Sequence, residues 1–219
     1  MTSMPRLETD KVDQKGRPLG RRALETRRRL LDATAELLGK RSVREIRIVE
    51  IARMVDTSPA TFYQYFKDIE EATLALAEEA AEEMPSVAEK IGGPWSGEAG
   101  LETARAIVDA FIRHWDKHQA VLRLRNLASD EGEPRFLEVR RRAMTPIMSE
   151  LARRMRKSQQ AGKTPKEMNP DAAAAALAAI LERLAAYHTE LEPLGVTRAD
   201  LVETSARILF QTVTGSSGA

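Results

Sequence analysis

The amino-acid sequence predicts an all-α protein, in which a small three-helix domain precedes a larger helical domain. Apolar residues recur every three or four positions through most of the chain, which is the spacing of one helix face. No segment of useful length alternates apolar and polar residues, as a half-buried strand does. Glycine, proline and capping residues divide the apolar pattern into about nine helical segments, without an internal repeat.

Residues 1–20 combine scattered charges, glycines and prolines without an apolar period, and this composition predicts a disordered basic arm. A first domain of residues 21–67 follows, and its helical segments are 24–38, 48–55 and 59–66. Gly39 suits the end of the first helix. Ser58 can cap the third helix, and Pro59 fits the first turn.

The second domain is expected at residues 68–214 and begins with a connecting helix, 68–91. Asp68 opens this helix with an acidic variant of the capping box. Gly92-Gly93-Pro94 predicts the loop that ends it. The later helical segments are 101–115, 121–127, 136–151, 172–191 and 197–212. Residues 215–219 are expected to form a flexible tail.

Composition excludes several classes of protein. Cysteine is absent from the 219 residues, so disulfides, thiolate metal sites and cysteine catalysis are excluded. No run approaches the ~20 apolar residues that cross a bilayer, and the N-terminal segment lacks the apolar core of a signal peptide. We therefore expect a cytoplasmic protein without a membrane partner.

Charge is divided unevenly along the chain, although the net charge is only +1. Residues 1–67 contain 15 lysines and arginines against 9 acidic residues, and the remainder contains 19 against 24. A basic front and an acidic rear indicate that only the front meets a polyanion. A chance asymmetry or a solvated tail is the alternative explanation.

The segments 48–55 and 59–66, joined by a tight turn at Asp56-Thr57, have the order of a helix-turn-helix. The second helix of this motif enters the DNA major groove. The apolar residues that can close a three-helix core around it are Leu38, Ile46, Ile51, Ala52, Val55, Phe62 and Phe66. Tyr63 and Gln64 then remain on the outside of the second helix.

The run Ile48-Val49-Glu50-Ile51-Ala52, with the core Thr61-Phe62-Tyr63-Gln64-Tyr65-Phe66, resembles the signature of TetR-family bacterial regulators. The similarity covers about residues 21–85. The resemblance implies double-stranded DNA as a partner and a homodimer. It also implies that the rear domain, from about residue 86, dimerises and binds a small-molecule effector.

By position, the resemblance implies that Thr61, Tyr63 and Tyr65 contact phosphates or groove edges. We expect Gln64 to read a base, because its amide can pair with adenine. Ala60 can meet a thymine methyl group. The predicted DNA contacts also include residues at the ends of the two helices: Arg47, Ser58, Pro59 and Lys67. Local packing is the alternative role for each of these residues.

Three positions depart from the family pattern. Arg47 stands where a small hydroxyl residue usually caps the helix, although an arginine can bind phosphate instead. Asp56 replaces the usual turn glycine and tolerates the required backbone better than most residues. Ile69 stands where a lysine is expected, so one phosphate contact is missing, and Lys67 is a possible substitute.

The arm offers a second set of DNA contacts. Arg17 lies in the sequence Lys15-Gly16-Arg17-Pro18, which resembles the core of hooks that insert arginine into narrow A·T-rich minor grooves. Arg21 and Arg22 follow closely. General attraction to phosphates, or no role, are the alternatives.

Two further sites are expected in the rear domain. Leu177 and Leu181 form an apolar ridge that, with the last helix, predicts half of a two-fold four-helix interface; ordinary intramolecular packing is the alternative. The last helix contributes Leu201, Ile208, Leu209 and Val213. An apolar or amphipathic effector would meet Phe111, Trp115, Met144, Ile147, Met148, Leu151, Leu181, Leu184 and Tyr187. Each of these is otherwise a core residue.

No metal or cofactor is predicted. His114 and His118 have a spacing that can grip a metal, but we expect a surface pair because the nearby acids do not clearly share their face. The favoured function is a repressor that its effector releases from DNA. The alternatives are the same fold controlled by a protein partner or by abundance, and a helical enzyme. An enzyme is disfavoured because three histidines, without a cysteine or a phosphate-cradling glycine loop, offer a poor supply of catalytic groups.

Overall fold

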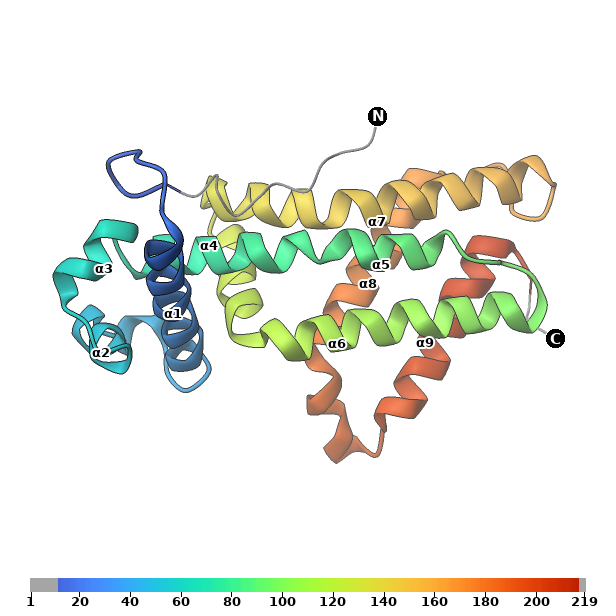
Figure 1. Cartoon of the computed structure of the whole chain (residues 1–219). Helices are drawn as coiled ribbons and strands as arrows, with labels where there is room; N and C mark the ends of the chain where they lie inside the picture. The colour runs from blue at the N-terminus through green and yellow to red at the C-terminus, as the bar shows by residue number, and fades with distance from the viewer. Residues whose placement is uncertain (1–11, 217–219) are drawn as a thin grey trace.

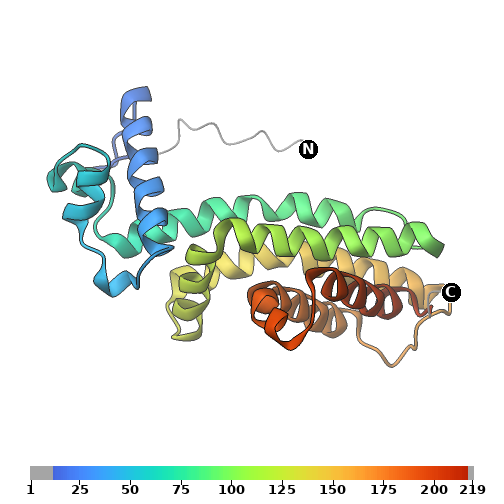
Figure 2. The same ribbon diagram turned by 90° about the horizontal axis from the view of Figure 1, so that it is seen from below.

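The computed structural model describes residues 12–216 and confirms the all-α fold. Within this range the only β pairing is an isolated bridge between Val12 and Pro18. A compact domain, from α1 (Arg21–Leu38) to α3 (Pro59–Tyr65), lies at one end of an elongated helical body, and α4 (Ile69–Glu82) joins the two (Figures 1 and 2). No helix among the described residues is long and apolar enough to cross a membrane.

The small domain comprises α1 (Arg21–Leu38), α2 (Ile48–Met54) and α3 (Pro59–Tyr65), with a 3-10 turn at Val43–Glu45. Its core forms because Phe62 and Phe66, one helical turn apart, are both buried, and Arg27 of α1 covers the Phe66 ring. Their rings lie 5.4 Å apart. This packing fixes the rotation of α3, and therefore decides which of its side chains remain outside.

The body comprises α4 (Ile69–Glu82), α5 (Met84–Ile91), α6 (Gly97–Asp130), α7 (Pro134–Gln160), α8 (Pro170–Leu191) and α9 (Arg198–Thr214). A 3-10 turn, Glu192–Leu194, links the last two helices. α8 packs on α6 and α7, and α9 packs mainly on α6. Figure 2 shows α8 and α9 together on the side of the body opposite α4 and α5.

Two helix boundaries differ from those expected. The connecting helix of residues 68–91 is broken into α4 and α5, because Pro85 lacks the amide hydrogen that would continue the helix. Segments 101–115 and 121–127 instead form one helix, α6, with a kink at His118 (φ −119°, ψ 16°). Leu127, at the end of the expected segment 121–127, is exposed.

The described parts of the two terminal segments, residues 12–20 and 215–216, are more ordered than expected. Residues 12–20 form a turn in which Asp13 accepts hydrogen bonds from the amides of Lys15 and Arg17. Gly215 ends α9 with φ +69°, and a side chain there would overlap the Lys163 carbonyl. Composition alone could reveal neither the local hydrogen bonds of Asp13 nor the close approach of Gly215 to the distant Lys163. The rest of the predicted arm and tail, residues 1–11 and 217–219, lies outside the described residues.

Candidate nucleic-acid interface and rear-domain sites

The turn between α2 and α3 has the geometry that the sequence predicts. Asp56 has φ +54° and is the one non-glycine residue with positive φ among residues 12–216. The Thr57 amide donates to the Ala52 carbonyl at 2.9 Å, which closes the turn. Ser58 caps α3 by accepting from the Thr61 amide at 3.3 Å, and Pro59 occupies the first turn.

The start of α2 is capped without a hydroxyl residue. The Arg47 amide donates to the Glu50 carboxylate at 3.0 Å, and this hydrogen bond lowers the pKa of Glu50. The Arg47 guanidinium has only donors and cannot cap the helix itself. Its side chain is exposed, which leaves it available to a phosphate.

The residues of α3 divide into a buried and an exposed set. Phe62 is fully buried, whereas Tyr63 is 53% exposed and Gln64 is also exposed. Thr61 and Tyr65 are half-buried. Among the other predicted contacts, Pro59, Ala60, Ser58 and Lys67 are exposed. The outer surface of α3 therefore combines a phenol, an amide and a small apolar residue without an internal salt bridge.

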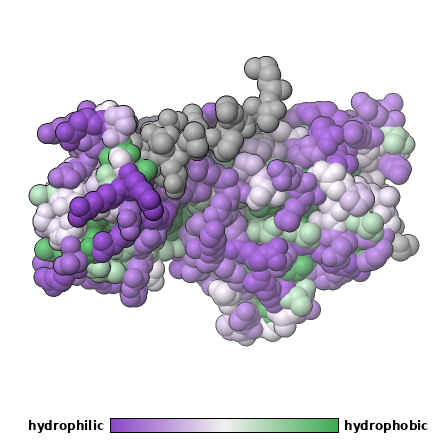
Figure 3. All heavy atoms as spheres, in the orientation of Figure 1, coloured by the Kyte–Doolittle hydropathy of each residue, from purple (hydrophilic) through white to green (hydrophobic). Residues whose placement is uncertain are grey.

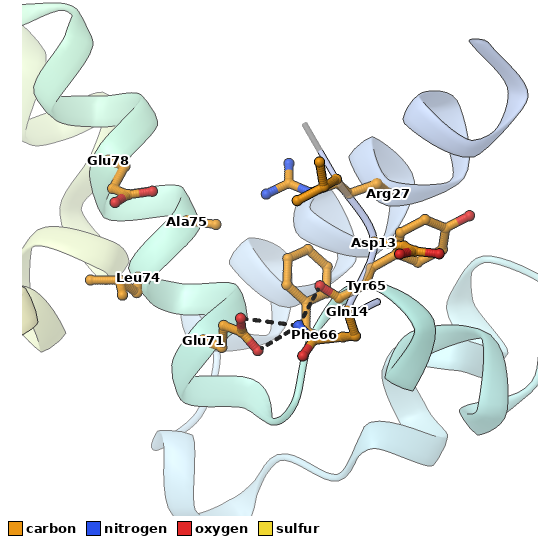
Figure 4. A pocket seen from close by; sticks show the side chains of 10 residues that line it. Asp13, Gln14, Arg27, Tyr65, Phe66, Glu71, Leu74, Ala75 and Glu78 are labelled. Atoms are coloured by element: carbon orange, nitrogen blue, oxygen red, sulfur yellow. Dashed lines mark hydrogen bonds between the residues drawn. The ribbon is translucent and has the colours of Figure 1, made fainter. Parts of the chain in front are cut away.

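The ordered part of the arm lies against the end of α3. The Gln14 amide donates to the Gln64 carbonyl at 3.0 Å. The Gln14 side chain donates to the Tyr65 carbonyl at 3.1 Å and to the Glu71 carboxylate at 3.0 Å (Figure 4). These contacts border a depression of about 460 Å³ between the arm, α1, α3 and α4. The arm therefore emerges beside the exposed surface of α3.

The three arginines that are predicted to contact DNA in the arm or directly after it differ in their surroundings. Arg17 pairs with Asp13, with 2.6 Å between the closest nitrogen and oxygen, and the Arg17 amide and guanidinium together lower the pKa of Asp13. Arg21 and Arg22 are exposed in the first turn of α1. Free amides and two arginines at one helix end form a favourable place for phosphate.

Several basic residues of α1 have structural partners instead. Arg29 donates to the Val55 carbonyl at 2.7 Å and so holds the end of α2. Arg28 pairs with Glu79 of α4 at 2.5 Å, and Arg27 lies 5.0 Å from the centre of the Phe66 ring. The basic charge of the first 67 residues is therefore shared between the exposed surface and the domain's own packing.

Part of the predicted effector pocket forms a small cavity. Phe111, Trp115 and Met144 line it together, and its volume of about 20 Å³ suits roughly one water molecule. Ile147, Leu151 and Leu181 are buried in the core, and Met148, Leu184 and Tyr187 are half-buried outside the cavity lining. The predicted set is therefore divided between a cavity and ordinary packing.

The cavity lining also includes two charged residues that the sequence did not single out, Arg125 and Glu182. Arg125 is only 3% exposed and donates to Glu182 at 2.8 Å. The side-chain nitrogens His114 Nε2 and Trp115 Nε1 are buried without a hydrogen-bond partner among the described residues. In the sequence, Arg125 could be recognised only as a charged residue within an apolar helical stripe. The kink at His118 interrupts the helical spacing, so that stripe is not apparent from the sequence.

The apolar ridge expected at a dimer interface lies inside the protomer. Five of its residues are at most 8% exposed: Leu177, Leu181, Leu201, Leu209 and Val213. They are covered because α8 and α9 each pack along α6. Ile208 alone in the predicted set is strongly exposed, at 42%. A different face of the two helices is exposed, and it includes Ile208, Ile180, Ala172, Ala175, Ala176 and Ala179.

The histidine pair is not the surface pair that the sequence suggested. The His114 side chain is 9% exposed, and burial together with the neighbouring His118 lowers its pKa to about 4. Asp109 and Asp116 pair with Arg198, at 2.9 and 3.1 Å, rather than with the histidines. The acidic neighbour of both rings is Glu83, from a different helix.

Comparisons with protein families identify both parts of the chain. The family model for bacterial regulatory proteins of the tetR family matches residues 30–79. The model for the tetracyclin repressor-like C-terminal domain matches residues 87–219. No match is found among curated protein sequences.

Solved structures share the fold at low sequence identity. GusR of Salmonella enterica is 19% identical, with 87% of this chain and 96% of that chain covered and a TM-score of 0.63. FadR of Bacillus subtilis, in complex with stearoyl-CoA, is 14% identical, with 86% and 98% covered and a TM-score of 0.60. SmeT, the repressor of the Stenotrophomonas maltophilia multidrug efflux pump SmeDEF, is 14% identical, with 85% and 87% covered and a TM-score of 0.58.

Proposed function

The chain belongs to the TetR family of bacterial transcriptional regulators, and on this premise we propose that it represses transcription from a palindromic operator. The observation that carries the proposal is the surface of α3. Tyr63 and Gln64 are exposed on a helix that Ser58 caps and Phe62 anchors. One short helix reads few bases, so two copies related by a two-fold axis would read two half-sites.

The proposal is tested by selecting bound sequences from a random duplex pool with the purified full chain at moderate salt. A palindromic consensus is expected, with half-sites about one helical turn apart. Recovery of no consensus, or of a single unpaired half-site, would contradict the proposed operator. Affinity for the selected site should fall steeply as salt rises, because basic side chains displace counterions from DNA.

Substitutions on α3 should separate a base reader from a phosphate contact. Gln64→Ala is expected to relax preference at one base position, with a discrimination loss of about 1–3 kcal/mol. Tyr63→Phe removes one hydroxyl and is expected to weaken all sites to a similar extent. Both are measured by fluorescence anisotropy on the selected operator and its single-base variants. Equal weakening at every site by Gln64→Ala would show that Gln64 is not a reader.

We assign dimerisation to the exposed face of α8 and α9. Alanines at four positions of this face allow close helix approach, and Ile180 and Ile208 supply larger apolar contacts. By contrast, hydrophilic side chains predominate on the opposite side of the molecule, where apolar atoms form only small separate groups (Figure 3). An isologous interface would repeat each contact twice.

Ile180→Glu and Ile208→Glu should each convert the dimer to a monomer, because the two-fold axis would bury two added charges without partners. Sedimentation velocity measures the change. Leu137→Glu is the matched control, since Leu137 is also exposed but lies on α7. A dimer that survives both interface substitutions would place dimerisation elsewhere.

For the effector we propose an apolar or amphipathic small molecule in the cavity beside Trp115. Apolar walls with a few buried polar atoms suit such a ligand. Release from DNA requires the ligand to bind one state of the protein better than the other. The volume of about 20 Å³ means that the cavity must open to admit it.

Because the cavity is too small to hold an effector without opening, it also favours a second candidate function, the same regulator without a small-molecule switch. A thermal-shift screen of amphipathic molecules distinguishes the two. Concentration-dependent stabilisation by a molecule that also releases DNA is expected for a ligand-controlled repressor. If the molecules that stabilise the protein leave DNA binding unchanged, or if none stabilises it, the second candidate holds.

A further inference from the structure

Two breaks in the helical body face each other and bring three metal-ligating side chains together. Glu83 lies in the break between α4 and α5, and His118 lies at the kink of α6. His114 is one turn before the kink, so both rings are on one face of α6. Their ring centres are 5.0 Å apart.

The distances among these side chains are close to those of a coordinated ion. Glu83 Oε2 is 3.0 Å from His118 Nε2 and 3.8 Å from His114 Nδ1. One ligand atom from each residue lies within 4.8 Å of the others. Around tetrahedral zinc, ligand atoms are separated by roughly 3.3 Å, given metal–ligand distances of about 2.0–2.1 Å. Small rotations of the three side chains are therefore sufficient to bring their ligand atoms to this separation.

The surroundings of His114 provide a second, independent observation that favours a bound ion. Its Nε2 atom is buried without a hydrogen-bond partner among residues 12–216, and its Nδ1 atom, 3.8 Å from Glu83 Oε2, is too far for a hydrogen bond. A buried imidazole with neither nitrogen hydrogen-bonded is costly, because buried polar groups normally have partners. A cation bound to Nδ1 would give this ring one polar partner, while Nε2 would carry the proton and stay unpaired.

We propose that Glu83, His114 and His118 form a binding site for a divalent transition-metal ion, of which Zn²⁺ fits best. Two imidazoles and one carboxylate are the donors that zinc accepts, whereas magnesium and calcium prefer oxygen ligands alone. Three protein ligands leave a fourth position open. Lys117 binds the other carboxylate oxygen, Oε1, at 2.7 Å and leaves Oε2 for the ion.

The ion would connect α4 directly to α6. α4 starts four residues after the end of α3, and Glu83 immediately follows its last residue. A metal bridge at Glu83 would fix that end of α4 against the kink of α6. Binding of the ion to the folded state alone must then raise the thermal stability of the protein.

The test is titration of ZnCl₂ into the untagged full chain by isothermal titration calorimetry, after treatment with a chelator. One Zn²⁺ per chain is expected, with a rise in melting temperature. Glu83→Gln and His118→Gln should each weaken binding at least about tenfold. Co²⁺ should give the strong visible absorption of a tetrahedral site in the wild-type chain and lose it in both variants.

Two controls make the result specific. Glu82→Gln removes an adjacent, exposed carboxylate and should bind Zn²⁺ as the wild type does. His188→Gln removes the third of the chain's three histidines, outside the cluster, and should also bind normally. Circular dichroism confirms folding of each variant. Absence of stoichiometric binding, or equal affinity in Glu83→Gln, His118→Gln and the wild type, overturns the proposal.

Discussion

Phe62→Ala is expected to abolish operator binding and to destabilise the small domain by about 3–5 kcal/mol. The ring is fully buried, and it contacts Phe66 in tilted geometry at 5.4 Å. Its removal leaves a cavity beneath α3 at the place where α1, α2 and α3 meet. Because α3 has only seven residues, it cannot hold its position without this anchor.

Urea unfolding measures this prediction with two probes. Both tryptophans, Trp95 and Trp115, lie outside the small domain, so their fluorescence reports the body of the protein. Circular dichroism reports all helices. In Phe62→Ala, part of the helical signal should be lost at lower urea concentration than the tryptophan signal. Coincident transitions at the wild-type midpoint would show that Phe62 is not the anchor.

Tyr63→Ala is the matched control, because Tyr63 is the next residue and is largely exposed. Its stability is expected to stay within about 0.5 kcal/mol of the wild type. Operator binding should nevertheless fall, because a groove-facing side chain is lost. The two variants thus separate failure of folding from failure of contact.

The small domain could be predicted from sequence because its determinants are local. Ser58 and Pro59 begin α3, Asp56 provides the turn, and Phe62 and Phe66 repeat at one helical turn. Each signal lies within ten residues of the others, and all favour the same structure. Such agreement between local preferences and the fold is typical of natural sequences.

The rear domain could be predicted only as a set of helices. Which face of α8 is buried depends on its packing against both α6 and α7, and Leu177 and Leu181 serve that packing rather than a dimer. The histidine cluster depends on Glu83, which is more than 30 positions earlier in the chain. Helical periodicity carries no information on such long-range contacts.

The distribution of charge along the chain does not reveal long-range contacts either. The excess of basic residues before position 68 does indicate where DNA binding is expected. It does not distinguish Arg29, which donates to the Val55 carbonyl at the end of α2, from Arg21 and Arg22, which lie in the first turn of α1. Only the positions of the partners separate a structural arginine from one available to phosphate.

Glu182→Gln is expected to destabilise the body of the protein by about 3–5 kcal/mol, because it leaves a buried cation without its counter-charge. Glu182 binds Arg125 at 2.8 Å and Arg140 at 2.6 Å. Arg125 is almost completely buried, and burial lowers its pKa. The Arg140 side chain is exposed enough for water to replace Glu182 as its partner, whereas the Arg125 side chain is too deeply buried for this.

Thermal and urea unfolding followed by tryptophan fluorescence measure the loss, since Trp115 lines the same cavity. Glu190→Gln is the control, because Glu190 is an exposed carboxylate on the same helix, and it should leave stability nearly unchanged. The double variant Arg125→Met with Glu182→Met removes both charges and should recover much of the loss. If Glu182→Gln alone were as stable as the wild type, Asn126, which accepts from Arg125 at 2.8 and 3.0 Å, together with water would be satisfying Arg125. The cavity would then be a wetter and more open site than its volume indicates.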